Sequence, residues 1–256
     1  MIQLSLVGIG TGNPDHLTRA AIRALNSADL ILLPRKGDAK SDLIDLRREI
    51  CAECVADSVR LVEFDLPQRA QAGEYLGRVR DWHAAIAQVW AENIAAHLPG
   101  GGRVALMVWG DPSLYDSSLR IAQRLIGAGM DVQIEVVPGI TSLQALTAAH
   151  RIPLNGLGAP VMITTGRRLR AEGWPQGVAR VAVMLDEGCA FESLPPEGIE
   201  IWWGAYLGMA AEYLISGRLA DMAPVIRTER ARLRAAHGWI MDIYVMENTF
   251  IQSVSG

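Results

Sequence analysis

The sequence is poor in several features that mark whole classes of proteins. Its 256 residues include only three cysteines, too few for the disulfide framework of a small secreted protein and typical of a reducing compartment. It has no run of about 18 uncharged apolar residues, so we expect no membrane-spanning helix. The first residues also lack the basic segment, apolar segment and cleavage site of a secretory signal. We therefore expect a cytoplasmic protein that does not associate with membranes.

Positive charge and metal-binding patterns are scarce as well. The 24 Lys and Arg residues are outnumbered by 28 Asp and Glu residues, whereas a general nucleic-acid-binding protein normally carries a basic face. The five histidines are scattered, and none forms the H-E-x-x-H pattern of a zinc site, so we expect no metal. What the chain does have is apolar residues, half of the total, enough for one large or two smaller cores.

One cysteine pair has a recognisable spacing, Cys51-Ala52-Glu53-Cys54. A zinc site would need a second pair, and a thioredoxin-like redox motif would need a preceding strand. Neither is present, and the pair lies at the end of a predicted helix. We interpret both cysteines as structural thiols.

A glycine-rich loop follows the first apolar run. Ile2–Val7 is typical of a buried strand, Gly8-Ile9-Gly10-Thr11-Gly12-Asn13-Pro14 follows it, and Leu17–Ala28 has the pattern of an amphipathic helix. Glycine lets backbone amides come close to a ligand and adopts positive φ at little cost. The loop therefore predicts a ligand-binding element.

A dinucleotide fold is the first interpretation to test. Its fingerprint is G-x-G-x-x-G, with a third glycine for close helix–strand packing. Here the order is G-x-G-x-G, and neither Asn13 nor Pro14 can replace that glycine. The second apolar run ends in Pro34-Arg35-Lys36 rather than in an acid for the ribose, and no G-K-[ST] motif is present. The spacing disfavours a nucleotide site.

Strand and helix patterns alternate along the chain, which indicates mostly parallel sheets covered by helices. We predict strands at 3–7, 30–33, 59–62, 103–108, 132–136, 159–164, 181–185, 199–203 and 240–246, and helices near 19–26, 43–55, 73–97, 117–126, 141–150, 208–216 and 228–236. The second half is richer in Gly and Pro. We expect two α/β domains, residues 1–136 and 137–256.

Two further loops follow predicted strands. Trp109–Tyr115 contains Gly110-Asp111-Pro112, and Pro138–Ser142 reads P-G-I-T-S. Each alone could be an ordinary turn or helix start. In open α/β sheets, however, ligands bind outside the carboxyl ends of strands, so these loops and the first one could share one crevice.

Together the three loops resemble the tetrapyrrole methylases, the class III S-adenosylmethionine-dependent methyltransferases. Val7–Thr18 is similar to the family pattern V-G-x-G-P-G-D-P-x-x-L-T, Gly110–Pro112 to the middle G-D-P, and Val137–Ser142 with Arg151–Leu154 to V-P-G-I-[ST]-S and G-I-P-L. Thr11 and Asn13 replace the family proline and aspartate. No catalytic role of that aspartate is therefore carried over.

The resemblance implies two α/β domains with a cofactor cleft between them, a homodimer, S-adenosylmethionine as methyl donor and S-adenosylhomocysteine as product. It implies no nucleic-acid partner. The positions that it places at the cofactor are Gly110, Asp111, Pro112, Tyr115, Thr141, Ser142, Met184, Ala205 and Ile240. For Met184, simple core packing is an equally good interpretation.

A tetrapyrrole substrate is a macrocycle fringed with carboxylates, which arginine binds through paired donors. Small residues Gly10, Thr11 and Gly12 would leave room for the ring, and Arg35 and Lys36 follow a strand end where they could bind its carboxylates. Further candidates are Lys40, Arg47, Arg48, Arg167, Arg168 and Arg170. A solvated basic face is the alternative for any one of them.

Segments outside the shared motifs, among them 36–50 and 203–208, are similar to one branch of the family. In that branch, methylation is coupled to loss of an acetyl group as acetate. Removing an acetyl group calls for a base that activates water, and the candidates are Asp15, His16 and Asp111. Asp15 could instead cap the first helix, and His16 could face solvent. Another methyltransferase of the family and a non-catalytic cofactor-binding protein remain open alternatives.

Overall fold

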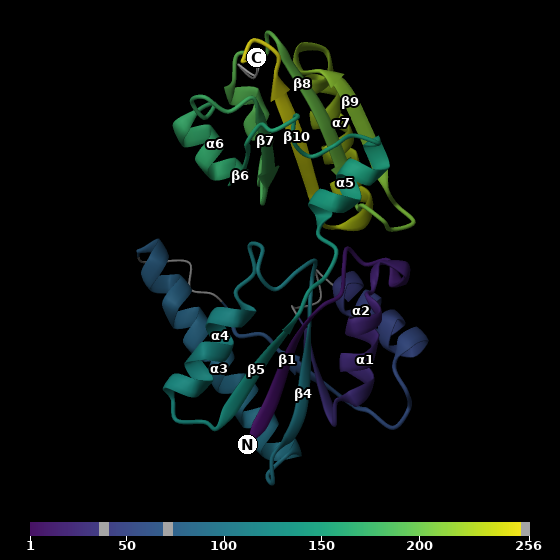
Figure 1. The fold of residues 1–256 in the computed structure, drawn as a ribbon, viewed down its shortest axis with the longest axis vertical. Coiled ribbons are helices and arrows are strands. Elements are labelled where there is room, and N and C mark those ends of the chain that lie inside the picture. The colour runs from purple at the N-terminus through teal and green to yellow at the C-terminus, as the bar shows by residue number, and fades with distance from the viewer. Residues whose placement is uncertain (36–40, 69–73, 252–256) are drawn as a thin grey trace. The chain divides into compact units, whose positions relative to one another are not determined.

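The computed structural model describes residues 1–35, 41–68 and 74–251, and the chain divides into two compact units at Thr141 and Ser142 (Figure 1). The division falls just after the expected boundary at residue 137. The reason is local, because Val137 still pairs with Val7 in the first sheet and the backbone of Gly139 packs against Gly8. The third glycine loop thus belongs to the first unit.

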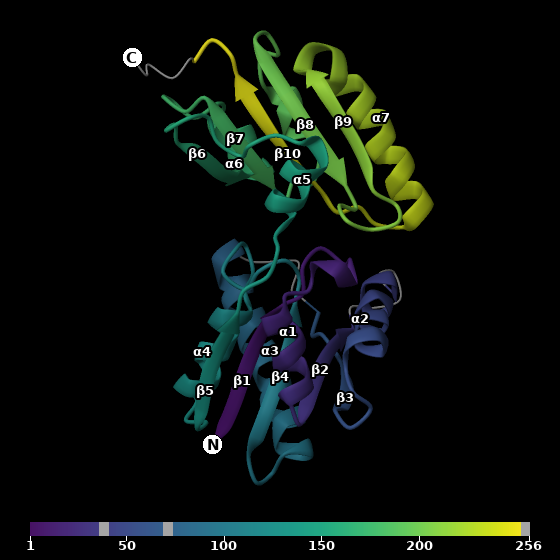
Figure 2. The same cartoon turned by 45° about the vertical axis from the view of Figure 1, so that its right-hand side comes forward.

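The first unit is built on a parallel five-stranded sheet in the order β3-β2-β4-β1-β5 (Figure 2). Its strands are β1 (Ile2–Gly8), β2 (Leu30–Arg35), β3 (Arg60–Asp65), β4 (Gly102–Val108) and β5 (Val132–Val137). Its helices are η1 (Pro14–His16), α1 (Arg19–Ser27), α2 (Ser41–Cys54), α3 (Tyr75–His97) and α4 (Ser118–Gly127). The predicted βα alternation is confirmed here.

Both faces of the three inner strands β2, β4 and β1 are buried, and the strand sequences show why. In β2, Leu30 and Leu32 pack with the cluster that contains Trp90 of α3, while Ile31 and Leu33 pack with the cluster that contains Leu25 of α1. Successive side chains of a strand point to opposite faces, so a run of four apolar residues serves two cores. Helices α1 and α2 cover one face, and α3 and α4 cover the other.

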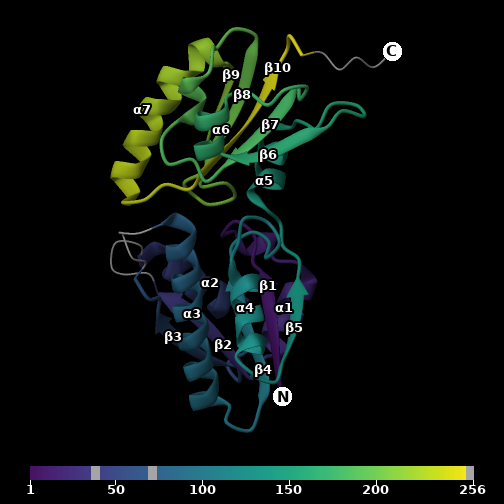
Figure 3. The ribbon, with the colours of Figure 1, turned by 90° about the vertical axis from the view of Figure 1, so that its left-hand side faces the viewer.

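The second unit holds a mixed five-stranded sheet in the order β6-β7-β10-β8-β9, with α5 and α7 packed on it (Figure 3). Its strands are β6 (Val161–Thr165), β7 (Arg180–Met184), β8 (Ile199–Ala205), β9 (Tyr213–Arg218) and β10 (Asp242–Asn248). Its helices are α5 (Ser142–His150), α6 (Gly166–Glu172), η3 (Ala190–Ser193) and α7 (Leu219–His237). Across the described residues of both units, no helix is both long and apolar enough to cross a membrane.

The predicted helix at 208–216 is wrong. Residues 213–218 form β9, an edge strand paired antiparallel with β8, and its burial alternates residue by residue. Tyr213-Leu214-Ile215 has the aromatic and β-branched character of a strand. Helix α7 begins at Leu219, earlier than predicted, and contains Pro224 in its first two turns.

Candidate cofactor and substrate site

The three glycine loops meet at one edge of the first sheet. Strands β4, β1 and β5 are parallel neighbours, so their carboxyl ends lie side by side. An isolated antiparallel bridge then joins the first two loops, with Gly110 N donating to Gly10 O at 2.7 Å and Gly10 N donating to Gly110 O at 3.4 Å. The loops therefore start from one edge of the first sheet. That they form one ligand crevice stays a prediction.

Glycine is required where the loops cross. A Cβ on Gly139 would lie 2.1 Å from Gly110 O, and a Cβ on Gly8 would lie 2.6 Å from Gly139 N. Both neighbours are backbone atoms, which cannot rotate away. Gly10 and Gly110 have φ of +76° and +63°, a region in which side chains are strained. The sequence therefore exposes bare backbone along this edge.

Gly139→Ala is expected to destabilise the protein by about 1–3 kcal/mol, the usual cost of overpacking a tight site. The added methyl group would force the third loop away from the first two. Gly127→Ala is the matched control, because a Cβ there meets nothing within 4 Å and its φ is not positive. Urea unfolding of both variants measures the effect, and equal stability of the two would contradict the crossing geometry.

Asp111 ties the second loop to the third. Its carboxylate accepts hydrogen bonds from Gly139 N at 2.9 Å, from Ser113 N at 2.8 Å and from the Ser113 hydroxyl. Burial raises the pKa of Asp111, but these hydrogen bonds outweigh it and hold the pKa below the ordinary 3.8. The contacts in the structure are those of a carboxylate that orders loops, and its role as a base stays a prediction.

Asp111→Ala is expected to cost about 1.5–3 kcal/mol at pH 7, since it removes hydrogen bonds to a charged acceptor. The pKa is lowered in the folded state, so the contribution is present above 3.8 and is lost as pH falls through the folded pKa. Unfolding curves of wild type and variant should therefore approach each other as the pH falls below 3.8. Asp15→Ala, at an exposed position, is the control and should leave stability unchanged.

The first loop positions His16. The Thr11 hydroxyl lies 2.9 Å from His16 Nδ1, and Thr11 is buried. Asn13, not Asp15, accepts the capping hydrogen bond of the short helix η1, and Thr18 caps α1 through Ala21 N. The alternative in which Asp15 caps the first helix is therefore wrong. Its role as a base, like that of His16, stays a prediction.

Four of the six candidate cations that the structure describes form ion pairs with acids of their own unit. Arg35 donates to Asp65 at 3.0 Å, Arg48 to Glu63 at 2.7 Å, and Arg168 and Arg170 to Glu172 and Asp186. Lys36 and Lys40 lie outside the described residues. Arg35 therefore remains a proposed substrate contact, and binding a substrate carboxylate would require it to leave Asp65. Arg47 differs from the others because it is buried.

The cofactor positions of the second unit also share an edge. Strands β7 and β8 both pair antiparallel with β10. Met184 and Ala205, the last residues of β7 and β8, therefore lie near the first residues of β10, where Asp242 pairs with Ala205. Ile240 lies just before it. Met184 and Ile240 are half-buried and Ala205 is buried. In the first unit, Thr141 is buried beside Gly110, and Tyr115 is exposed with φ +50°.

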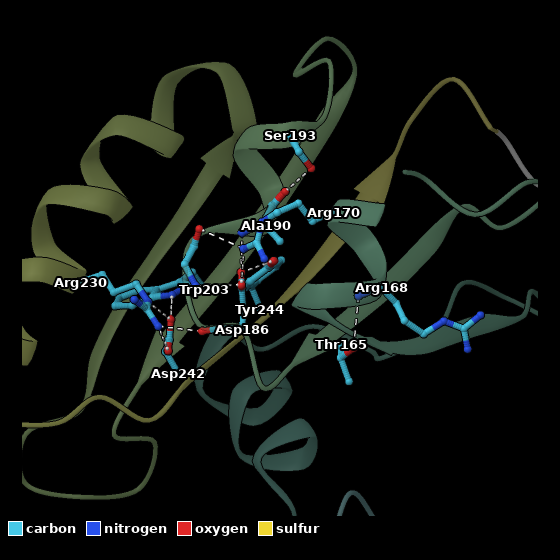
Figure 4. A network of polar contacts seen from close by, with 11 residues as sticks. Thr165, Arg168, Arg170, Asp186, Ala190, Ser193, Trp203, Arg230, Asp242 and Tyr244 are labelled. Atoms are coloured by element: carbon cyan, nitrogen blue, oxygen red, sulfur yellow. Dashed lines mark hydrogen bonds and ion pairs between the residues drawn. The ribbon is translucent and has the colours of Figure 1, made fainter. Parts of the chain in front are cut away.

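A buried polar network lies beneath this second edge (Figure 4). The carboxylate of Asp186 accepts from Ala190 N at 2.6 Å, Tyr244 Oη at 2.8 Å and Arg170 at 3.1 Å. Arg230 donates to Asp242 at 2.8 Å and to the carbonyl of Asp186 at 2.8 Å. The network fixes the loop that follows Met184.

Burial and charge oppose each other within this network. Burial opposes the charge of Arg230, but its hydrogen bonds to Asp242 raise the pKa. Burial raises the pKa of Asp242 and, together with the nearby Asp186, that of Tyr244. No motif marked these residues, although one signal was present. Arg230 interrupts the apolar stripe formed by Ile226 and Leu233 of α7, and a charge on such a stripe must find a buried partner.

The cysteines are not paired by disulfides. Cys51 and Cys189 are buried, and Cys51 Sγ lies 3.6 Å from Met107 Sδ. Burial raises the pKa of both thiols to about 11, which keeps them protonated and unreactive. Within the described residues, no group of His, Cys, Asp or Glu side chains could hold a metal ion.

The sequence model of the tetrapyrrole (corrin/porphyrin) methylases matches residues 3–223, a span that runs from β1 into α7. The chain belongs to the tetrapyrrole methylase family. Among methylases of known function, it is 49% identical over 250 residues to precorrin-6A synthase [deacetylating] of Sinorhizobium sp., covering 96% of this chain and 95% of that protein. This similarity confirms the branch of the family that the sequence indicated.

Solved methylase structures agree. A putative cobalamin synthesis related protein (CobF) of Corynebacterium diphtheriae matches with a TM-score of 0.84 and 35% identity, over 97% of this chain and 100% of that one. The uroporphyrin-III C-methyltransferase of Thermus thermophilus, solved with S-adenyl homocysteine, has a TM-score of 0.59 and 19% identity over 97% and 93% of the two chains. At that identity the second match shows the shared fold alone.

Proposed function

We propose that this protein is an S-adenosylmethionine-dependent C-methyltransferase that converts precorrin-5 into precorrin-6A. The reaction methylates carbon 1 and releases acetate, as a step of aerobic cobalamin synthesis. The observation that carries the proposal is the 49% identity to a deacetylating precorrin-6A synthase over nearly the full length of both proteins. The glycine edge supports it, because this edge offers bare backbone where the family motifs lie.

The described residues fit S-adenosylmethionine. In the first unit, Gly110 has no side chain to cover the loop backbone, and Thr141 lies beside it and carries a hydroxyl. Ser142, which opens the second unit, carries another. In the second unit, Met184 and Ile240 are half-buried apolar side chains at one sheet edge, suited to a flat purine. The cofactor, when bound, supplies an electrophilic methyl group on a sulfonium. The protein's contribution is to align that methyl group with the ring carbon.

Release of acetate needs a second set of residues. Water oxygen bonds to the acetyl carbonyl carbon, the bond from that carbon to the ring breaks, and its electron pair stays on the macrocycle. A base must take the proton from the water. Among the three candidates, we assign this role to His16, because Thr11 orients its ring, whereas the Asp111 carboxylate is already engaged by Gly139 and Ser113.

The test is a reaction of the purified protein with methyl-labelled S-adenosylmethionine and precorrin-5. We expect one labelled methyl group in the product and one equivalent of acetate. Methyl gain without acetate would identify another methyltransferase of the family. Cofactor binding without transfer, in an assay that works with a known synthase, would identify a non-catalytic binding protein. We also propose a homodimer, which sedimentation velocity would test.

A further inference from the structure

A cavity of about 260 Å³ lies within the first unit and is lined entirely by residues before Thr141. Pro34, Phe64 and Val108 of its lining stand at or near the carboxyl ends of β2, β3 and β4. Helices α2, α3 and α4 close the other sides. This is the position in a parallel sheet where ligands bind, and the function proposed above assigns nothing to it.

The cavity wall is mostly apolar and rich in aromatic rings. Phe64, Trp82, Trp90 and Trp109 line it, and Trp90 is only 4% exposed. The indole Nε1 atoms of Trp90 and Trp109 are buried without a hydrogen-bond partner among the described residues. Buried donors are normally satisfied. A wall of this kind suits a flat ring whose side arm carries hydrogen-bond acceptors, such as a carboxylate.

Two charged side chains complete the lining. Arg47 is 7% exposed, and its guanidinium lies over the Trp109 ring, 4.9 Å from the centroid. Burial lowers the pKa of Arg47 to about 10, while the charge of Asp116 opposes this, so the side chain is still protonated at neutral pH. Asp116 accepts from Ser118 N at 2.6 Å. The lining of the cavity thus contains one cation and one carboxylate.

The volume of the cavity limits the size of its ligand. A water molecule takes about 30 Å³ and drug-sized pockets begin near about 300 Å³, so the cavity is too large for acetate alone and too small for a macrocycle. One five-membered ring with a short arm has the matching scale. A pyrrole of the proposed substrate also has the matching groups, a ring N–H for Asp116 and a carboxylate for Arg47.

We propose that this cavity binds one pyrrole ring of the tetrapyrrole, with the acidic arm of that ring paired with Arg47 and the ring stacked among the tryptophans. The inference rests on the proposed function for its substrate. It adds a place where one corner of the macrocycle is anchored. Anchoring one corner fixes which carbon of the ring is presented for reaction.

The first measurement needs no turnover. The probe is 3-(pyrrol-3-yl)propionic acid, titrated into the protein while tryptophan fluorescence and heat are recorded. Arg47→Met should weaken its binding roughly ten- to a hundredfold, the effect of losing a charged hydrogen-bond partner. The propionamide analogue should bind the wild type as weakly as the acid binds that variant. Arg48→Met is the matched control, because Arg48 follows on the same helix but is held outside the cavity by Glu63.

A second variant keeps the charge of Arg47 and reduces the volume of the cavity. Ser118 is half-buried and lines the cavity, so Ser118→Leu should fill part of it and abolish probe binding. Both variants should raise the KM for precorrin-5 and leave the affinity for S-adenosylmethionine unchanged. Probe binding in a protein that never transfers a methyl group would refute the proposed function alone. If both variants are active and their KM for precorrin-5 equals that of the wild type, the cavity proposal alone is refuted.

Discussion

His16→Asn is expected to slow acetate release about a hundredfold or more, the usual contribution of a positioned general base. The base must have an unprotonated nitrogen that faces water. If His16 Nδ1–H donates to the Thr11 hydroxyl across the observed 2.9 Å, Nε2 is the nitrogen left to take the proton. Asparagine retains a polar side chain of similar reach to Thr11 but cannot accept a proton near neutral pH. Rapid-quench measurement of acetate in a single turnover gives the rate.

Thr11→Val separates orientation from chemistry in the same experiment. Valine keeps the shape of threonine and removes only the hydroxyl that holds the ring, so its effect should be smaller than that of losing His16. Calorimetry should show unchanged S-adenosylmethionine affinity in both variants. Acetate release at the wild-type rate in His16→Asn would rule out this residue as the base and return the assignment to Asp15 or Asp111.

Arg230→Met is expected to destabilise the protein by about 3–5 kcal/mol, the cost of leaving a buried charge without its partner. The partner is Asp242, whose side chain is 6% exposed. Methionine fills the space of the arginine stem, so the loss is mainly electrostatic. Arg232→Met on the same helix removes the exposed pair with Glu229 and should cost less than about 1 kcal/mol.

The pH dependence of that variant has a definite sign. Without Arg230, the pKa of Asp242 in the folded state rises further above its unfolded value. The neutral Asp242 carboxyl can be buried at little cost, whereas the ionised carboxylate cannot. Stability is therefore lost as pH rises through the folded pKa of Asp242. Urea unfolding should show a larger deficit at pH 8 than at pH 5. Arg230→Met combined with Asp242→Asn should remove this pH dependence, because asparagine can still accept from Trp203 Nε1. A deficit that is constant with pH would contradict the ion pair.

The first unit could be predicted well because its signals are local. Each β-strand is a short apolar run, and each glycine loop follows such a run directly. The family motifs also indicated three glycine loops that could share one crevice, but the crossing of Gly8, Gly110 and Gly139 is visible only in the structure. In the structure, the tightest contact for an added Cβ is at Gly139, and Gly110 instead requires its positive φ.

The features that could not be predicted depend on contacts between residues far apart in the sequence. Arg35 is an attractive cation in the sequence because nothing there reveals that Asp65 ends the neighbouring strand and pairs with it. Strand β9 was missed because its Tyr-Leu-Ile run also fits one turn of an apolar helix, and only the edge of β8 decides between them. The link between Arg230 and Asp186 has no fixed spacing at all.

The crossing of the three glycine loops has a consequence for the order of folding. Its parts come from positions 8, 110 and 139, so it cannot form until β1 has paired with both β4 and β5. Such nonlocal pairings carry the largest loop-closure entropy and form slowly. Cofactor affinity should therefore appear only in the last phase of refolding. A newly made chain would therefore bind its ligand only after β1 has paired with both β4 and β5.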